Sequence, residues 1–555
     1  MNTSTAPKAQ YGYASGSANT IRPTTMTYPD GRVLTYGYGT AGGNNDAASR
    51  VESLIDDDGS STYLADYSYL GLGTFVEVDY TEPDVKYTLV GTAGGNDPDT
   101  GDIYRGFDRF GRIKDSYWVN YGASADADRK GDRGRSPYVG RPSRSSQKSR
   151  QDTRVRDPKR IQVSCLGSFD ELYGYDRVDR LQDMERGRLA ALKNSISSLR
   201  FAQGWSLDAT GNWKTFREDD DGTGWDLDQT RTANKVNEIT DIAETLGPSW
   251  VTPVYNRAGN MTTIPKPADP TTSFGATYDA WNRLVGISSG GTTVAGYEYD
   301  GAKRRIVKKA YTSGTLTETR HAYFTEPSKW QVIEERVDSS SSAERQFVWG
   351  PRYIDDLVLR DRDTDANGTL DERLYGMLDA NWNVTGLVST SGTVQERFAY
   401  SAYGEPMFLD ASFGSRSSSS FAWERLIAGY PWDADVAWYA VRHRVYIVGL
   451  GWAQRDPVLY MSGTNLHEYV GDNPSVSVDP SGLGPIQTIR LAIVKALKGK
   501  ICNQLFSFCM HIGRHRDFGA NGCKVCLTLY DTVCLTGNEQ LTNKMLNEAC
   551  KAIYK

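Results

Sequence analysis

Two aspartates near the C-terminal end are the residues best suited to chemistry. Asp456 and Asp479 each precede a proline. Proline disfavours helical backbone for the residue before it, so both carboxylates are expected on rigid, extended turns. Two carboxylates held together do not ionise together easily, so one keeps a proton. Such a pair predicts peptide hydrolysis, with one carboxylate as base toward water and the other as proton donor. The alternative is that both Asp-Pro pairs are only turns that end strands.

The elements that must position these carboxylates are short strands, because much of the chain repeats one unit. The unit begins with an aromatic or apolar residue that is followed by Asp or Asn. Two or three turn residues come next, then a basic or polar residue, and an apolar residue ends the unit. Asp can bond its own backbone, and Gly or Asn tolerates positive φ, so each unit predicts a hairpin. The unit begins six times, at Phe107, Tyr175, Leu207, Tyr255, Tyr278 and Tyr299.

The composition agrees with a β-protein and excludes several classes. The chain has 33 Tyr, 16 Phe and 55 Gly, which suits many short strands with one wet face. A net charge of −6 gives the whole chain no nucleic-acid-binding field, so no nucleic-acid partner is expected for the repeats. No apolar run of 18 residues predicts a transmembrane helix. The first residues lack an apolar segment, so no signal peptide is expected in this chain.

The repeats resemble the YD repeats of the Rhs family, which also includes toxin-complex C components and teneurins. The resemblance covers roughly residues 20–483 and extends to LDANWNVTGLVSTSGTVQERFAYSAYGEP (378–406) and NLHEYVGDNPSVSVDPSGL (465–483). It implies an all-β fold in which a spiral of YD-repeat β-hairpins forms a hollow shell, complete or incomplete. A small Cys-rich, partly helical C-terminal tail follows the shell.

In the family that the chain resembles, the C-terminal edge of the Rhs repeat-associated core plugs the shell and carries an intramolecular aspartyl protease. Carried over to this sequence, the catalytic residues are Asp456, Asp479 and Arg444, with Arg442 as the second choice for the arginine.

The same resemblance places the cleavage site between Leu483 and Gly484. The sequence departs from the family pattern at Leu459, where Gly is usual, and in the segment VYIVGLG before Trp452. Leu is unfavourable where a turn needs positive φ, so the departure puts the activity of the pair in doubt.

The predicted organisation has five parts. The parts are N-terminal repeat strands (1–128), a basic low-complexity insertion (129–168), the repeat shell (169–400), the Rhs-associated core plug with the Asp-Pro motifs (401–483) and a variable, Cys-rich, basic C-terminal domain (484–555). The insertion is rich in Arg and Ser, and three interpretations are open: a disordered segment, a stretch translated out of frame, or a basic arm.

An acidic stretch offers a candidate Ca²⁺ site. Asp363, Asp365, Asn367 and Asp371 fall at positions 1, 3, 5 and 9 of a calcium loop. Position 12 is Leu374 in place of the usual Glu, so a polar turn is the competing interpretation. No other cofactor is expected.

The C-terminal domain differs in character from the rest of the chain. It holds ten Lys and Arg against four Asp and Glu, and it begins with a basic amphipathic helix that suits a protein core or an anionic membrane. His511 and His515 could join a zinc site with a Cys-x-x-Cys pair or serve a nuclease-like site; three disulfides or free thiols are the other interpretations. The cysteines are Cys502, Cys509, Cys523, Cys526, Cys534 and Cys550.

Three functions follow from these features. The chain is a bacterial polymorphic toxin whose shell encloses its own C-terminal segment as cargo and releases it by self-cleavage. Alternatively, it is a secreted or cell-surface structural protein, without cleavage, that binds a surface protein or glycan. The third interpretation is a degraded reading frame. Cleavage at the predicted site distinguishes the first from the others.

Overall fold

The computed structural model divides the chain into two compact units, Met1–Leu483 and Gly484–Lys555. Only Gly484 and Pro485 of the second unit are described, so the predicted tail helix, its cysteines and its histidines lie outside the described residues. The described residues are 7–15, 21–60, 62–90, 106–107, 113, 116–120, 125–130, 159–163, 169–190, 194–326, 328–461 and 463–485.

The first unit is almost entirely antiparallel β-sheet, and its one described α-helix is the single turn α1 (Asn44–Ala47). The described residues form four sheets, and in each of them every strand pairs with the next described strand in the sequence. The all-β fold class is therefore confirmed.

The first sheet holds nine strands: β1 (Gln10–Tyr13), β2 (Pro23–Thr27), β3 (Val33–Gly37), β4 (Ser53–Ile55), β5 (Tyr63–Leu70), β6 (Thr74–Tyr80), β7 (Val85–Thr88), β8 (Ser116–Asn120) and β9 (Ala125–Lys130). The second holds seven: β10 (Lys159–Val163), β11 (Asp170–Tyr175), β12 (Leu181–Leu189), β13 (Ile196–Leu207), β14 (Trp213–Asp219), β15 (Leu227–Ala233) and β16 (Ile239–Leu246). Strand β10 falls within the stretch interpreted as an insertion.

The third sheet holds fifteen strands: β17 (Val254–Tyr255), β18 (Met261–Lys266), β19 (Asp269–Tyr278), β20 (Leu284–Ser289), β21 (Thr292–Tyr299), β22 (Arg305–Thr312), β23 (Thr315–Phe324), β24 (Val332–Val337), β25 (Arg345–Trp349), β26 (Leu357–Arg362), β27 (Glu372–Leu378), β28 (Val384–Ser389), β29 (Val394–Tyr400), β30 (Pro406–Asp410) and β31 (Ser415–Arg416). The fourth holds four: β32 (Trp432–Asp433), β33 (Trp438–Val441), β34 (Arg444–Ile447) and β35 (Gly451–Trp452). Three 3-10 turns complete the elements: η1 (Ile427–Gly429), η2 (Leu459–Met461) and η3 (Val470–Asp472).

The hairpin turns share one hydrogen-bonding pattern. Oδ1 of Asp279 accepts the backbone N–H groups of Trp281 and Arg283 at 2.9 and 3.0 Å, and Asn282 between them has a φ of 61°. An Asp or Asn that bonds its own backbone and a residue in the left-handed region thus close the turn. The same side-chain bonds recur at Asp176, Asp208, Asn234, Asn256, Asp300, Asp379 and Asp410.

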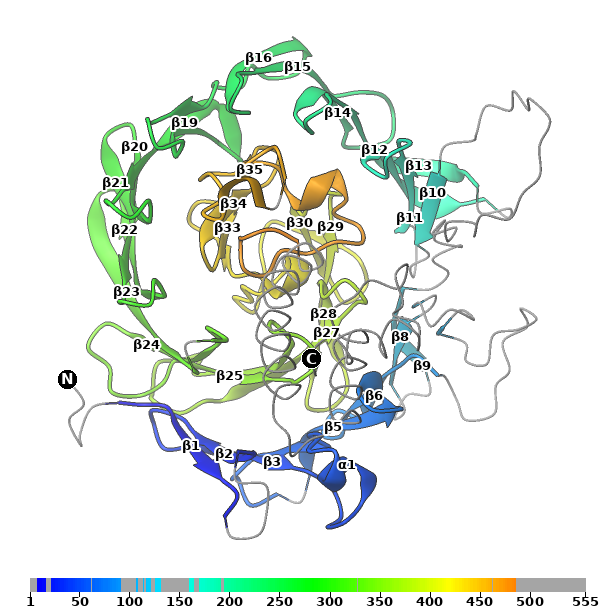
Figure 1. Cartoon of the computed structure of the whole chain (residues 1–555), viewed down its shortest axis with the longest axis vertical. Coiled ribbons are helices and arrows are strands. Elements are labelled where there is room, and N and C mark those ends of the chain that lie inside the picture. The colour runs from blue at the N-terminus through cyan, green and yellow to red at the C-terminus, as the bar shows by residue number, and fades with distance from the viewer. Residues whose placement is uncertain are drawn as a thin grey trace, which may run out of the picture. The chain divides into compact units, whose positions relative to one another are not determined.

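The first three sheets form a wall around residues 417–483, which we call the inner segment. Strands β11–β25 curve around β33–β35 in Figure 1, and the two layers are joined by contacts such as Tyr297 Oη to Asp433 Oδ2 at 2.9 Å. The first sheet packs on the third, where Tyr28 and Tyr80 donate hydrogen bonds to the carbonyls of Phe347 and Gly376. Among the described strands, no ladder of backbone hydrogen bonds joins one sheet of the wall to another.

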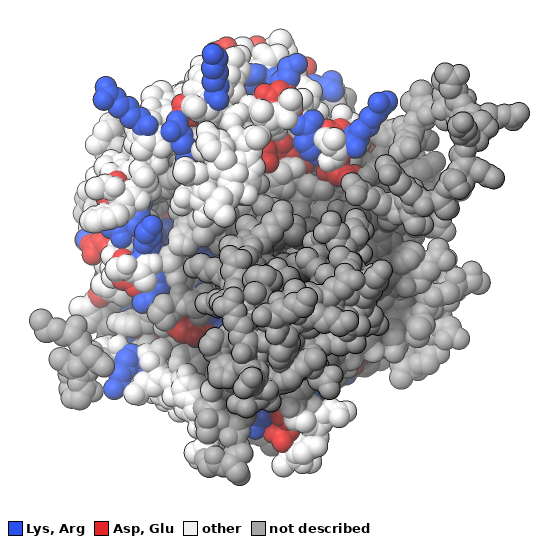
Figure 2. All heavy atoms as spheres, viewed as in Figure 1, with Lys and Arg blue, Asp and Glu red and all other residues white. Residues whose placement is uncertain are grey.

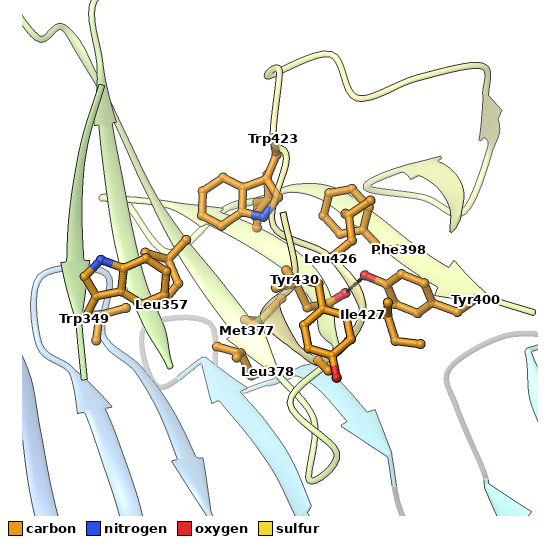
Figure 3. Close-up of a cluster of buried hydrophobic side chains, with 14 of the residues drawn as sticks. Trp349, Leu357, Met377, Leu378, Phe398, Tyr400, Trp423, Leu426, Ile427 and Tyr430 are labelled. Carbon is orange, nitrogen blue, oxygen red and sulfur yellow. Dashed lines mark hydrogen bonds between the residues drawn. The ribbon is translucent and has the colours of Figure 1, made fainter. Parts of the chain in front are cut away.

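An apolar cluster seats the start of the inner segment on the wall. Its side chains come from two regions, residues 423–430 and strands β25–β29, and Figure 3 shows them converging. Burial of this many large side chains is the main driving force for docking. The labelled members are Trp349, Leu357, Met377, Leu378, Phe398, Tyr400, Trp423, Leu426, Ile427 and Tyr430.

The charged side chains of both signs are interspersed over the described surface on the face shown in Figure 2. Such a mixture fits the small net charge of −6. Among the described residues, no helix has the length and apolar character needed to cross a membrane.

Candidate functional site

The fourth sheet positions Arg444. Strands β33 and β34 form a hairpin in which Val441 pairs with Arg444, so Arg442 and His443 make a tight turn at its tip. The guanidinium of Arg444 lies over the ring of Trp452 at 4.1 Å from the centroid, and Arg444 is 3% exposed. A cation–π contact and the strand pairing therefore fix the direction of this side chain.

Arg444 brings the two predicted aspartates together. Its Nη2 lies 3.1 Å from Oδ2 of Asp456 and 3.2 Å from Oδ2 of Asp479. Both carboxylates are buried, at 2% and 1% exposure. Burial lowers the pKa of the Arg444 guanidinium, and the two carboxylates oppose this effect. The two buried carboxylates are therefore held together by one shared arginine.

The other carboxylate oxygens accept hydrogen bonds from nearby donors. Oδ1 of Asp456 accepts the N–H of Val458 at 2.9 Å. Oδ1 of Asp479 accepts the hydroxyl of Ser481 and the N–H of Leu483, both at 3.1 Å. These bonds hold each side chain in one orientation, with its Oδ2 toward the shared arginine.

The tip of the β33–β34 hairpin is hydrogen-bonded to the chain just before the predicted cleavage site. The carbonyls of residues 480–482 accept hydrogen bonds from residues 442–444, one from each. Gly482 has a φ of 69°, and a Cβ there would lie 3.2 Å from the backbone nitrogen of Arg444. The pairs are Arg442 Nη1 to Pro480 O at 2.6 Å, His443 N to Ser481 O at 3.1 Å and Arg444 Nε to Gly482 O at 2.5 Å.

The tip itself is anchored to the wall through Arg442. Its Nη1 and Nη2 lie 2.8 and 2.7 Å from the two carboxylate oxygens of Asp355. Two parallel, charge-assisted bonds of this kind define position as well as strength. The backbone N–H of Asp479 also donates to Tyr430 Oη at 2.8 Å, which ties the site to the apolar cluster.

Sequence reasoning missed Asp355 and Tyr430 as parts of the site. Neither residue belongs to a motif, and Asp355 lies 87 positions before the arginine that it binds. The sequence offers Arg442 only as an alternative to Arg444 for the arginine of the site. In the structure both arginines take part, since Arg442 binds Asp355 and Arg444 binds the two aspartates.

Leu459 occupies the turn after Asp456. Its φ is 55°, its N–H donates to the carbonyl of Asp456 at 2.9 Å, and its side chain is 58% exposed. The position does use the left-handed region in which Gly is preferred. The departure from the family pattern therefore strains this turn while leaving Asp456 paired with Arg444.

The predicted calcium loop folds as a closed turn. Asp363 accepts the N–H groups of Asn367 and Gly368, and Asp371 accepts the N–H and the hydroxyl of Thr364. The carboxylates therefore already accept donors of the chain itself. Calcium binding at Asp363, Asp365, Asn367 and Asp371 stays a prediction.

Another acidic group gathers in the described part of the chain. Oxygen atoms of Asp219, Asp221 and Asp226 lie within 4.8 Å of one another in the loop between β14 and β15. Asp219 there accepts the N–H groups of Asp221, Gly222 and Gly224, as expected of a loop that caps its own backbone.

The fold has counterparts among solved structures of toxin complexes. The Tc holotoxin pore of Photorhabdus luminescens matches 83% of this chain with a TM-score of 0.59 and 14% identity. The TcdB2-TccC3 complex matches the same share with a TM-score of 0.58 and 14% identity. The chain has the same fold as this part of the toxin complexes. It covers 21% of each of these solved chains.

Two curated relatives share sequence with the chain, and no family model matches it. The tRNA3(Ser)-specific nuclease WapA of Bacillus spizizenii is 24% identical over 286 residues, which is 50% of this chain and 11% of the relative. The tRNA(Glu)-specific nuclease WapA of Bacillus subtilis subsp. natto is 24% identical over 235 residues, 41% of this chain and 9% of the relative. The chain thus spans about a tenth of the length of these relatives.

Proposed function

We propose that the chain is an Rhs-type β-shell that cuts itself between Leu483 and Gly484 and releases a toxin-like C-terminal segment. The observation that carries the proposal is that Arg444 contacts two buried aspartates and also donates a hydrogen bond to Gly482, just before the proposed cut. Pairs of carboxylates that share a proton hydrolyse peptides at such sites.

In the proposed reaction, one carboxylate takes a proton from water while the water oxygen bonds to the carbonyl carbon of Leu483. The other carboxylate gives its proton to the carbonyl oxygen. The first carboxyl then gives its proton to the nitrogen of Gly484 as the bond from the carbonyl carbon to that nitrogen breaks, and a hydroxyl of the intermediate returns a proton to the second carboxylate. A carboxylic acid at Leu483 and an amine at Gly484 remain. Arg444 offsets the negative charge of the pair throughout.

The comparisons support the toxin-like role of the released segment. The curated relatives are tRNA-specific nucleases, and the solved neighbours belong to a toxin complex. Residues 484–555 take the place of the cargo in this proposal, and the protein is bacterial and secreted.

The test is the intact mass of the purified full chain beside Asp456→Asn and Asp479→Asn. Wild type should split into two fragments, the smaller beginning at Gly484, and both variants should stay whole. Asp435→Asn is the matched control, because Asp435 is an inner-segment carboxylate that pairs with Lys308 and is 39% exposed. A folded wild type that stays uncut, or a variant that is cut at the wild-type rate, would refute the proposal.

A further inference from the structure

A cavity of about 490 Å³ lies between the wall and the inner segment. The wall contributes residues of strands β20–β26, and the inner segment contributes residues 422–459. Both belong to the first unit. A volume of this size matches the space that a small organic molecule occupies in a protein.

Arg425 lines this cavity and forms no direct ion pair with the described residues. The residue is 8% exposed, and its guanidinium lies 5.6 Å from the ring centroid of Phe347 and 5.5 Å from that of Trp349. No described acceptor bonds its side-chain nitrogens, yet none of them is fully enclosed. They therefore face the space of the cavity.

The other buried cations of the cavity lining form ion pairs with carboxylates. Arg345 lies 2.9 Å from Glu424, and Lys308 lies 2.7 Å from Asp433. Arg444 also reaches the cavity, but its guanidinium already serves two carboxylates. Arg425 is thus the buried positive charge of the described lining that lacks an anion of its own.

Burial lowers the pKa of Arg425, and the carboxylates of Glu335, Asp355 and Glu424 oppose this effect without reversing it. Burial of a guanidinium that has no direct ion pair is unfavourable. A planar guanidinium binds a carboxylate through two parallel hydrogen bonds. The cavity lining also holds Trp330, Trp423 and Trp432, which offer flat apolar surfaces for a ring.

We propose that this cavity binds a small organic molecule made of an aromatic ring and one carboxylate, with Arg425 as the partner of the carboxylate. One unpaired positive charge calls for one negative charge, and the tryptophans bury the ring. The site requires only the folded wall and inner segment, so it stands whether or not the chain cuts itself.

The test is a titration of the full chain with 2-naphthoate, followed by calorimetry and by tryptophan fluorescence. The uncharged isostere 2-naphthamide serves as the matched ligand. We expect 2-naphthoate to bind at least tenfold more tightly than the amide. Arg425→Met should remove that preference, and Arg425→Lys should keep part of it.

Lys303→Met is the control variant, since Lys303 also lines the cavity but is exposed to solvent. Its affinity for 2-naphthoate should stay within about twofold of wild type, because water screens an exposed charge. Thermal unfolding of each variant shows that the fold is intact. Equal binding of acid and amide, unchanged binding by Arg425→Met, or no binding to the folded wild type would overturn the proposal.

Discussion

Leu483 donates its backbone N–H to Oδ1 of Asp479 at 3.1 Å. The residue on the N-terminal side of the proposed cut therefore contacts one of the two carboxylates that we propose to be catalytic. Because the turn from 479 to 483 carries both groups, the site and its substrate segment are held together by folding alone.

Cleavage is accordingly expected to occur within one molecule. The fraction cut at a given time should not change when the protein is diluted 100-fold, since an intramolecular step has no dependence on concentration. Gel quantification of a time course started by refolding checks this. Mixing Asp479→Asn with wild type provides the control, because the variant should remain whole; a rate that rises with concentration would contradict cleavage in cis.

Removal of Arg444 should affect both stability and cleavage. Arg444→Met leaves two buried carboxylates without their shared cation, so we expect a loss of about 3–5 kcal/mol in the free energy of unfolding and no cut. Denaturant unfolding and intact mass measure the two effects. Lys329→Met removes an exposed ion pair with Glu326 and should cost about 1 kcal/mol or less. Equal losses in the two variants would argue against the arrangement.

Leu459→Gly should stabilise the turn that carries Asp456. The left-handed backbone of Leu459 costs about 1–2 kcal/mol that Gly does not incur. Since the side chain is 58% exposed, little burial is lost. We expect a higher unfolding midpoint and faster cleavage, measured by thermal denaturation and a cleavage time course. Leu459→Ala keeps the Cβ and should show neither gain; a gain of equal size would assign the effect to the side chain.

Stability should fall as the pH rises toward 8. Burial raises the pKa of Glu468 to about 8 and that of Asp472 to about 7, and the Asp472 carboxylate adds to the shift of Glu468. A carboxyl whose pKa is higher in the folded state stabilises the fold at low pH, and this contribution is lost as the pH rises through the folded pKa. Urea unfolding from pH 5 to pH 9 measures the slope.

Asp472→Asn isolates one of these groups. The amide keeps an oxygen for Tyr403 Oη, which lies 3.2 Å from Asp472 Oδ1. The variant should be more stable than wild type at pH 9, and the difference should shrink steadily as the pH falls toward the unfolded pKa of aspartate, about 4. Asp410→Asn, at an exposed turn, should leave the slope unchanged; an Asp472→Asn slope equal to that of wild type would show that the buried carboxyl is not responsible.

The sequence was most informative where structure depends on neighbours along the chain. Asp279 accepts hydrogen bonds from residues two and four positions later, so a short stretch of sequence is enough to predict this turn. The same turn hydrogen bonds occur at Asn234 and Asp410, which were not among the predicted repeat units.

The residues that support the site could not be predicted in this way. Arg444, Asp456 and Asp479 came from motif resemblance, and the structure places them in contact. The bond of Arg442 to Asp355 and that of Asp479 to Tyr430 link residues 87 and 49 positions apart. Such contacts depend on how the inner segment docks on the wall, which no local pattern records.

The pairing of each strand with its neighbour in the sequence has a consequence for the order in which the parts of the chain fold. Within each sheet of the wall, every strand pairs with its predecessor, so each sheet can grow in order as the ribosome delivers the chain. We expect the contacts of the inner segment to form last, because this segment follows the wall in the sequence and its hairpin tip binds Asp355 of the wall. The proposed cut then acts as a checkpoint on assembly: a chain that stalls before completion never acquires the means to sever itself.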